Sequence, residues 1–485
     1  MTSMNELIAD LFGQQWVIDL LTELAERQRG SLALTEQVRP NSAGGHVFMP
    51  FHAPQFPLAV VEASGSRLTD IDGNSYLDVH LGFGGQSLFG HNPPEVVDFV
   101  RSQLGVVNSG NGYLNPIELK LVEVLRDLVP HNEKFAFLNS GTDATNAAIR
   151  LARAHTGRRL VAKFEGCWHG VHDIAAHNTS FLAHGHPRVR PFPEISPERG
   201  VTPEVGFKGA VSNDILVLPH DTTLALALIE KHKDELACVL GEVASQSVPF
   251  TEHNVPRILK VAHRCRALGV PFVLDEVLTG FRFGAAGAAA RFDIPTDLIC
   301  YGKVVSGLGV GLSVVAGRAE LIDRMQTTGL GLGDIGQKTF VQNTHSGNHL
   351  ALAASYAALR KLRDEGEPFY DRTRAKVHSL QSRLAEFRSE TSIPLRLLGF
   401  GEFCGTFGFV AQDSYADYRE FAGAVNALGS VMLTLQLRRR GVYTFSMPMF
   451  YTGDAHSDAD IDEVYTAVTE SAQEMEKHGF PFVLP

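Results

Sequence analysis

The spacing of apolar side chains changes along the chain, and each change marks a different kind of element. Residues 3–29 place apolar side chains at near-helical intervals, which predicts one amphipathic helix. We expect its apolar face to pack on its own domain or on a second subunit, with another protein as the alternative. Residues 30–56, rich in Gly, Pro, Ser and His, are expected to form a loop. Apolar and polar residues alternate over 59–80 around Asp72-Gly73, which predicts a small antiparallel sheet with a hairpin turn.

Between residues 90 and 345, short continuous apolar runs alternate with helical patterns such as 142–155 and 254–268. Runs of this kind predict strands that are buried on both faces. Because helices separate them, we expect a mostly parallel sheet covered by helices, and the fold class is α/β. The predicted strands are 134–139, 159–164, 236–241, 271–275, 297–301 and 311–316.

The last part of the chain reads as a smaller α+β domain, with strand-like runs at 394–399, 403–410 and 440–445 between helical segments. The expected parts are an N-terminal helix and loop (1–56), the N-terminal part of the small domain (57–89), the large domain (90–364) and the C-terminal small domain (365–485).

Composition narrows the classes of protein that the chain can belong to. Its 485 residues are 44% hydrophobic and 20% charged, which is ordinary for globular proteins and excludes disordered and coiled-coil chains. The net charge of −11 argues against general affinity for nucleic acid or an anionic membrane. Because the sequence contains no uncharged apolar run of about 18 residues, no membrane-spanning helix is expected.

The cysteines and the N-terminus point to a cytoplasmic protein. The five cysteines are scattered and form no CxxC pair, so neither a disulfide framework nor a zinc site is expected. Glu6 and Asp10 interrupt the N-terminal apolar pattern, which is not typical of a secretory signal.

Lys303 follows the predicted strand 297–301 after a single glycine, Gly302. Ligands of parallel sheets bind at the carboxyl ends of the strands, so residues at these ends are the first candidates for chemistry. A partly desolvated lysine amine at such a position can attack a carbonyl group. The alternative is an ordinary solvated surface lysine.

Asp275 ends the predicted strand 271–275. An acid there suggests a buried charge partner, and the alternative is the N-cap of a following helix. No histidine or acidic cluster at ligand spacing accompanies it, so no metal is expected.

Two further strand ends carry candidate binding groups. Ser140, Gly141 and Thr142 follow the strand 134–139 and open a helix, whose N-terminal N–H groups favour an anion such as phosphate. The segment matches neither GxGxxG nor a P-loop. Trp168 follows the strand 159–164 and can stack on a flat cofactor or simply pack.

The four groups together suggest one cofactor. An amine, an acid, an anion cradle and an aromatic ring at the ends of strands of one sheet are what pyridoxal 5′-phosphate requires. The lysine binds the cofactor, the acid keeps the ring nitrogen protonated, the cradle holds the phosphate, and the aromatic ring covers one face.

The sequence also resembles a known family, the class-III pyridoxal-phosphate aminotransferases of fold type I, and within it the glutamate-1-semialdehyde aminomutase branch. The resemblance covers about residues 67–355, with a further likeness toward the C-terminus. The stretches that carry it are LTDIDGNSYLDV, FGHNPPEV, LNSGTDATNAAIRLARAHTGR, KFEGCWHG, FVLDEVLTGFRFG, DLICYGKVVSGLGVG and THSGNHLALAA.

This resemblance implies roles for the catalytic and ring-binding residues. Lys303 is expected to bind the cofactor covalently and to move protons during the reaction. Asp275 is expected to pair with the ring nitrogen. Val277 is expected to pack on the ring face opposite Trp168.

The resemblance also implies how the phosphate is held. Ser140, Gly141 and Thr142 are expected to bind it within one chain. Thr344, in THSGN, is expected to reach the phosphate of the neighbouring subunit. The active unit is therefore expected to be a homodimer with shared active sites.

Several positions depart from the family pattern. Glu242 is followed by Val243 where the family often has proline, which leaves the contact to the ring hydroxyl open among Ser245, Gln246 and Ser247. His349 stands where proline is common.

The segment 444–451, TFSMPMFY, carries no charge and lacks the glutamate expected of the aminomutase. No arginine matches the residue that would bind a substrate carboxylate. If the segment lines the substrate side, the substrate is a hydrophobic or aromatic amine, a β-amino acid or a carrier-linked acyl chain rather than glutamate 1-semialdehyde. The alternative is that these residues are core of the small domain.

The predicted function is an aminotransferase that moves an amino group between an amino acid and a carbonyl compound, apolar or carrier-linked, in specialised metabolism. The alternatives are an intramolecular aminomutase of the glutamate-1-semialdehyde type and, from another class, a non-catalytic binding or regulatory protein that keeps the fold but not the chemistry. The expected partners are small molecules, a second copy of the chain and a carrier protein, without nucleic acid or membrane. The sequence leaves the donor and the acceptor open.

Overall fold

The computed structural model describes residues 4–42, 56–106, 113–177, 214–245, 249–326, 332–399, 402–445 and 448–483. The chain divides into two units. Unit 1 comprises Met1–Pro93, Asp371–Ser414 and Ala424–Pro485, and unit 2 comprises Pro94–Tyr370 and Tyr415–Gly423.

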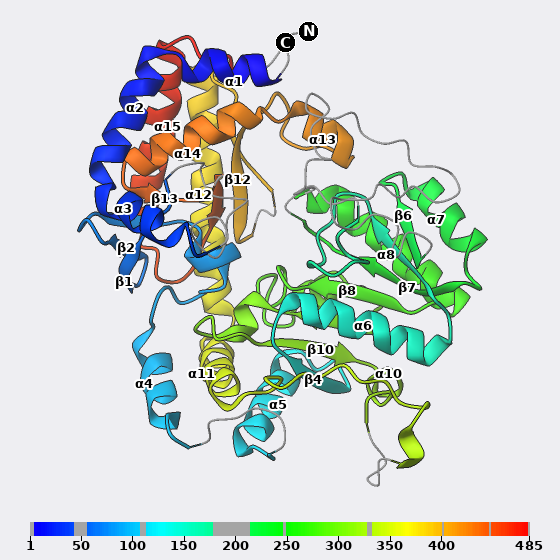
Figure 1. Cartoon of the computed structure of the whole chain (residues 1–485). Helices are drawn as coiled ribbons and strands as arrows, with labels where there is room; N and C mark the ends of the chain where they lie inside the picture. Colours follow the sequence, from blue (N-terminus) through cyan, green and yellow to red (C-terminus); the bar gives the residue numbers. More distant parts are fainter. Residues whose placement is uncertain are drawn as a thin grey trace. The chain divides into compact units, whose positions relative to one another are not determined.

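A seven-stranded sheet forms the centre of unit 2 (Figure 1). Its order is β4 (Lys134–Leu138), β10 (Ser313–Gly317), β9 (Leu298–Tyr301), β8 (Phe272–Glu276), β7 (Leu236–Gly241), β5 (Leu160–Phe164) and β6 (Ile215–Leu218). All neighbours from β9 to β6 are parallel, and β10 runs antiparallel to both β4 and β9. The predicted mostly parallel α/β sheet is therefore confirmed, with β6 as a strand that the sequence pattern missed.

Helices cover both faces of this sheet because its strands are apolar on both faces. Val273 of β8 belongs to the same buried cluster as Leu151 of α6 (Gly141–Thr156). Successive strand residues point to opposite faces, so Phe272 faces the other way. There it meets α8 (Thr251–Leu268), since a side chain at Gly241 would touch both Phe272 and Ile258.

The remaining helices of unit 2 are shorter or lie to one side of the sheet. They are α4 (Pro94–Gln103), α5 (Pro116–Leu128), α7 (Thr222–Lys231), α9 (Gly287–Arg291), α10 (Ala319–Ile322), α11 (His349–Glu365) and most of α13 (Tyr418–Ala424). Helix α11 packs on α4 and α5. All five cysteines are buried and free.

Unit 1 contains two small sheets. One has the order β1 (Val60–Ser64), β2 (Arg67–Asp70), β3 (Ser75–Asp78) and β13 (Val442–Tyr443), and the other has the order β11 (Leu395–Leu398), β12 (Cys404–Phe409) and β14 (Met449–Tyr451). The predicted hairpin is present, with Gly73 at φ +83° between the antiparallel strands β2 and β3. Only glycine adopts such a backbone conformation without strain.

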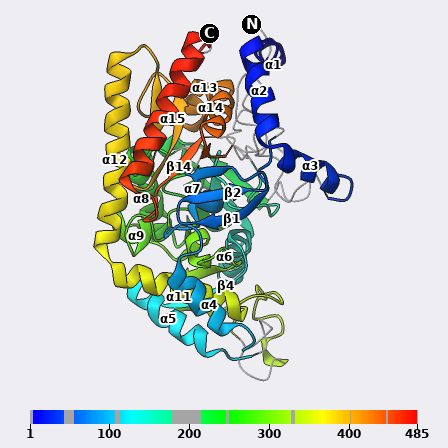
Figure 2. The ribbon, with the colours of Figure 1, turned by 90° about the vertical axis from the view of Figure 1, so that its left-hand side faces the viewer.

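Three helices cover the sheets of unit 1, namely α12 (Glu367–Glu390), α14 (Ala427–Arg439) and α15 (Asp458–Lys477). Helices α12 and α15 lie side by side, with Arg383 of α12 over the Tyr465 ring of α15 at 4.0 Å (Figure 2). Among the described residues, the chain forms no helix that could cross a membrane.

The N-terminal region differs from the prediction in its continuity. It forms three helices, α1 (Met4–Phe12), α2 (Gln15–Arg27) and α3 (Arg29–Val38), so a single helix over 3–29 is wrong, and so is a loop over the part of 30–56 that α3 occupies. Gln14, with extended backbone angles, separates α1 from α2. Asp72 accepts hydrogen bonds from Gly30 N and Ser31 N at the start of α3.

The apolar face of α2 packs within unit 1. Val17, Leu20 and Leu24 are buried in one cluster with Val464 and Val468 of α15. Of the three occupants considered for this face, its own domain is the one that the structure shows.

Candidate active site

The predicted site residues follow four strands of the unit 2 sheet, β4, β5, β8 and β9. These strands all run in the same direction, so their carboxyl ends lie at one edge of the sheet. They are not adjacent, because β10 lies between β4 and β9, and β7 lies between β8 and β5.

Lys303 leaves β9 in an unusual backbone conformation. Its φ is +46°, a left-handed value that costs a residue with a side chain of this size free energy. The hydroxyl of Ser306 donates to the Lys303 carbonyl at 2.6 Å and closes the short turn that starts there. Strained conformations of this kind concentrate at functional sites.

Three segments meet around Val277, directly after β8. A Cβ atom at Gly302 would lie 2.9 Å from Val277 Cγ1 and 3.6 Å from Gly141 Cα. A Cβ atom at Gly141 would also lie 2.9 Å from Val277 Cγ1. A side chain therefore fits at neither glycine. The turn that starts at Lys303 (the lysine turn) and the start of α6 both approach Val277.

Asp275 is buried and accepts two hydrogen bonds. One comes from the backbone N–H of Val277 at 2.9 Å, and the other links its Oδ2 to Nδ1 of His169 at 2.7 Å. Burial lowers the pKa of His169 despite the opposing effect of Asp275, so the imidazole is neutral and Nδ1–H donates to the carboxylate. The predicted carboxylate thus has a histidine partner that the sequence analysis did not assign.

The N-terminus of α6 is formed by Ser140, Gly141 and Thr142. The Ser140 hydroxyl accepts the Asp143 N–H at 3.2 Å and so caps the helix. Thr142 lies against the loop after β5, where Gly170 has φ +106° and a Cβ atom would lie 2.7 Å from Thr142 Oγ1. This close approach joins the proposed phosphate cradle to the segment that carries Trp168.

Lys163 fixes the loop after β5. It lies on β5, is 1% exposed, and its ammonium group donates to three backbone carbonyls. The acceptors are the carbonyl oxygens of Cys167 (2.9 Å), Ala175 (2.8 Å) and His177 (2.6 Å). Trp168 follows one of these anchored residues and is half-buried.

Thr344 is exposed. The neighbouring Asn343 accepts a hydrogen bond from Asn139 at 2.5 Å, beside the start of α6. Asn348 caps α11, and His349 bonds to Asn115 through Nδ1 at 2.7 Å.

The segment 444–451 belongs to unit 1, where most of it is buried. Phe450 of β14 lies in the hydrophobic core, and Thr444 donates to the Met449 carbonyl at 2.7 Å. Ser446 and Met447 lie outside the described residues, as do Gln246 and Ser247. For Phe450, the alternative that the segment is core of the small domain is the one observed.

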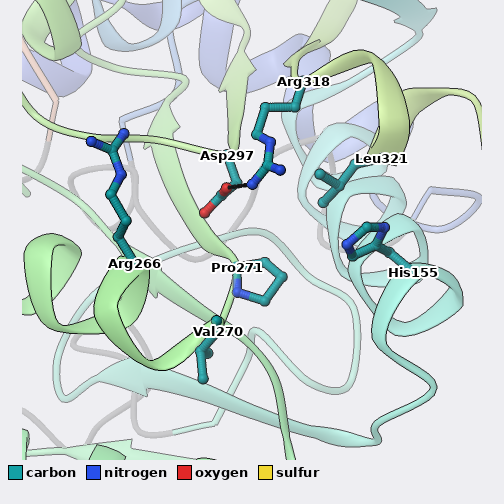
Figure 3. Close-up of a pocket in the computed structure, with 8 residues that line it drawn as sticks. His155, Arg266, Val270, Pro271, Asp297, Arg318 and Leu321 are labelled. Carbon is teal, nitrogen blue, oxygen red and sulfur yellow. Dashed lines mark hydrogen bonds and ion pairs between the residues drawn. The ribbon is translucent and has the colours of Figure 1, made fainter.

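A separate cavity of about 390 Å³ lies at the opposite edge of the unit 2 sheet (Figure 3). Pro271 and Asp297, which precede β8 and β9, line it, and Asp297 is paired there with Arg318 at 2.6 Å. Since the candidate residues follow the strands rather than precede them, this cavity is not the candidate active site.

The described side chains fit a flat, phosphorylated cofactor. A helix N-terminus provides N–H groups for the phosphate. A buried carboxylate at Asp275, an aromatic ring at Trp168 and a valine at position 277 can contact the ring. Lys303 leaves its strand next to the same valine.

Three functional candidates were missed, namely Lys163, His169 and Glu242. The strand 159–164 was expected to be buried and contains a lysine. That lysine was a usable signal, because a buried lysine needs a hydrogen-bond or charge partner. His169 directly follows Trp168, but its partner lies 106 residues away in sequence, and sequence spacing does not show such a contact.

Comparison with known proteins places these features in context. A family model described as aminotransferase class-III matches residues 48–468. The glutamate-1-semialdehyde 2,1-aminomutase of Chloroflexus aggregans is 29% identical over 459 residues, covering 93% of this chain and 99% of that protein.

Solved structures share the fold. An omega-transaminase from Sphaerobacter thermophilus superposes with a TM-score of 0.81 at 25% identity, covering 92% of this chain and 97% of that one. A glutamate-1-semialdehyde aminomutase from Pseudomonas aeruginosa, in complex with PMP, gives a TM-score of 0.79 at 22% identity, covering 94% and 97%. The expected fold type I is thereby confirmed.

Proposed function

Since the chain belongs to the class-III aminotransferase family, we propose that it moves amino groups at the site formed by Lys303, Asp275 and the first turn of α6. The observation that carries the proposal is the convergence of the lysine turn and the helix start on Val277, two residues after the buried Asp275. A lone surface lysine would need neither a closed position before it at Gly302 nor the close approach of Gly141 to the same valine.

Family membership confirms pyridoxal 5′-phosphate as the cofactor. In our proposal Gly141 and Thr142 hold its phosphate, Trp168 and Val277 contact the two faces of its ring, and Asp275 pairs with its ring nitrogen. When bound, the cofactor withdraws electrons from the substrate carbon that carries the amino group, so that a proton can leave that carbon.

Side chains of the protein supply a negative charge beside the ring nitrogen and transfer a proton. The negative charge of Asp275 keeps the ring nitrogen protonated, since an opposite charge within about 4–6 Å favours the charged form. The Lys303 amine then takes the proton from the substrate carbon and returns it at a neighbouring position, as general base and general acid. His169 holds the Asp275 carboxylate in place through the 2.7 Å hydrogen bond.

We favour an exchange of amino and carbonyl groups within one molecule, as in glutamate-1-semialdehyde aminomutase. The support is the likeness to a curated aminomutase over 93% of the chain. The reading preferred from the sequence, transfer between an amino acid and an apolar or carrier-linked carbonyl compound, becomes the second candidate.

A specific observation keeps transfer between two molecules as a candidate. The segment 444–451 has no charged residue, and no arginine matches the one expected to bind a substrate carboxylate. The omega-transaminase likeness, with a TM-score of 0.81, is compatible with this reading. The burial of Phe450 in the core weakens it, because a core residue does not line a substrate site.

One experiment separates the candidates. The holoenzyme is supplied with glutamate 1-semialdehyde alone, or with apolar amines together with a 2-oxo acid. Formation of 5-aminolevulinate from the semialdehyde alone supports the aminomutase, and turnover only of amine and oxo-acid pairs supports the aminotransferase. Purified protein without the visible absorbance of a lysine-bound cofactor would contradict both and leave a non-catalytic protein.

We also propose that the active unit is a homodimer in which Thr344 serves the partner's phosphate. Thr344 is exposed. Two large apolar side chains are exposed as well: one is close to Thr344 in the sequence, and the other adjoins a residue that contacts the end of the Thr344 segment. Leu114 is 95% exposed and Phe340 is 79% exposed. Leu114 adjoins Asn115, whose side chain bonds to His349 at the end of the Thr344 segment.

A further inference from the structure

Three buried side chains meet behind Asp275. Cys167 and His169 follow β5, and Glu242 follows β7, the strand between β5 and β8. One donor or acceptor atom from each of the three lies within 4.8 Å of those of the other two. None of the three has a role in the reaction described so far, except that His169 supports Asp275.

His169 has one ring nitrogen committed and one open. Nδ1 donates to Asp275, and the neutral imidazole therefore presents Nε2 as an acceptor. Nε2 is buried and has no hydrogen-bond partner among the described residues. A buried acceptor without a donor costs free energy, so a donor is expected nearby.

Glu242 can supply that donor. Burial raises its pKa well above the usual value, Asp275 raises it further, and Lys303 and Lys163 lower it. A raised pKa favours the protonated carboxyl, whose O–H group can donate a hydrogen bond. Its Oε2 is buried and, within the described part of the chain, also lacks a hydrogen-bond partner.

A metal ion is the competing occupant of the cluster, since Cys, His and Glu are common ligands. Two observations disfavour it. The ammonium group of Lys163 binds the Cys167 carbonyl at 2.9 Å and repels a dication. Burial also raises the pKa of the Cys167 thiol to about 12, so a metal ion would first have to displace a proton from it.

We propose that Glu242 is a positioning residue that donates a hydrogen bond, directly or through one water molecule, to Nε2 of His169 and so fixes the tautomer that donates to Asp275. The inference rests on the proposed function, because it gives Asp275 its role toward the cofactor. Hydrogen bonds from residues that do not themselves touch a cofactor orient the groups that act on it.

The consequence concerns charge. If Glu242 is neutral, Asp275 is the one negatively charged side chain among Asp275, His169 and Glu242. Its charge then acts on the ring nitrogen of the cofactor without a second negative charge beside it. An ionised Glu242 would instead place a second negative charge in the same buried region, where such charges act over distance with little screening.

The test uses holoenzyme variants at Glu242. Glu242→Gln keeps a neutral hydrogen-bond donor, and Glu242→Leu removes it at similar size. For each, the visible absorbance of the lysine-bound cofactor is titrated with pH, and kcat and KM are measured. We expect the glutamine variant to keep the absorbance transition and kcat within about threefold, and the leucine variant to lose about tenfold in kcat with little change in KM, the effect of one lost buried hydrogen bond.

Cys167→Ala is the matched control, because it removes the third member of the cluster and leaves the proposed hydrogen bond intact. Unchanged titration and kcat in this variant support the proposal. Stoichiometric zinc in the purified protein, lost in Cys167→Ala, would overturn it. So would a glutamine variant as impaired as the leucine variant, because that result means that the negative charge is needed.

One further readout keeps the test valid if Glu242→Leu folds poorly. A protonated-carboxyl band in the infrared spectrum of the holoenzyme that disappears in Glu242→Gln supports the proposal, and its absence from the wild type contradicts it. Failure of the proposed function is distinguishable, because wild-type protein would then lack the lysine-bound cofactor before any variant is made.

Discussion

Val277 fills a space that two glycines leave open for it. A methyl group added at Gly302 would overlap Val277 Cγ1, at 2.9 Å, while the φ at Gly302 is one that alanine adopts freely. We expect Gly302→Ala to cost about 1–3 kcal/mol in cofactor binding through overpacking. The measurement is cofactor affinity by absorbance titration.

The matched double variant distinguishes crowding from other causes. Gly302→Ala with Val277→Ala removes the overlapping methyl groups and should recover part of the lost affinity. Wild-type affinity in the single variant would show that the lysine turn can move away from Val277.

Lys303 is the residue that we expect to be joined to the cofactor. Borohydride reduction followed by peptide mapping should place the label on Lys303 alone. Lys303→Arg should lower kcat at least about 100-fold, since it removes the proton-transfer group. Lys361→Arg, which changes an α11 lysine paired with Glu365, is the control and should retain activity. A label on another lysine would refute the assignment.

Sequence reasoning named the residues that we propose to act on the cofactor, but not those that hydrogen-bond to them or to their loop. Lys303 and Asp275 stand at strand ends, a position that an apolar run marks in the sequence. His169, Lys163 and Glu242 matter because of where their side chains point after folding. That depends on how distant strands pair, and it leaves no local pattern.

Among the elements, α2 offers a direct test of the N-terminal packing. Leu24 is fully buried in the hydrophobic core of unit 1, whereas Ile18 on the same helix is 41% exposed. Leu24→Ala should cost about 2–5 kcal/mol of stability, as buried leucines do. Ile18→Ala should change it by less than about 0.5 kcal/mol. Urea unfolding measures both, and equal effects would contradict the packing described.

Helix α15 begins with a capping box whose stability should depend on pH. Ser457 and Asp460 bond to each other's backbone N–H groups. Burial alone would raise the pKa of Asp460, but bonds from Ser457 and the charge of Arg67 lower it overall. A lowered folded pKa means that the stabilisation is present above about pH 4 and is lost as pH falls through the folded value.

Asp460→Asn removes this pH-dependent contribution. The difference in unfolding midpoint between wild type and variant should be constant near neutral pH and should shrink below about pH 4. A difference that does not vary with pH would mean that the carboxylate charge contributes nothing.

The sequence pattern predicted the longer elements correctly. It missed elements that are short or that depend on a contact between residues far apart in the sequence. The six predicted strands of the large sheet are present within one or two residues. Strand β6 has only four residues, too few to stand out as a pattern. Helix α3 starts where the Asp72 side chain binds its first N–H groups, and that contact joins residues about 40 apart in sequence.

For the whole molecule, the expected assembly is a homodimer held through unit 2. Leu114→Glu places a charge on an apolar side chain that is 95% exposed in the single chain. Buried in an interface, that charge would be costly, so the variant should shift the equilibrium toward monomers and lose activity. Sedimentation across concentration measures this.

Thr344→Ala separates assembly from cofactor binding. It should leave the dimer intact and weaken cofactor retention, because our proposal gives Thr344 a contact to the phosphate and none that holds the dimer together. A fully active monomer at assay concentration would refute the shared site.

Strand β10 has a consequence for the geometry of the whole site. It runs against its neighbours, so that Ser313 pairs with Leu138 at the end of β4 and Val314 pairs with Tyr301 at the end of β9. The strand ends that lead into the proposed phosphate cradle and into Lys303 are thus two inter-strand steps apart, roughly 10 Å. Backbone hydrogen bonds between the strands fix this distance. Loops around the site can therefore change which substrate is accepted while the two anchoring points keep their separation.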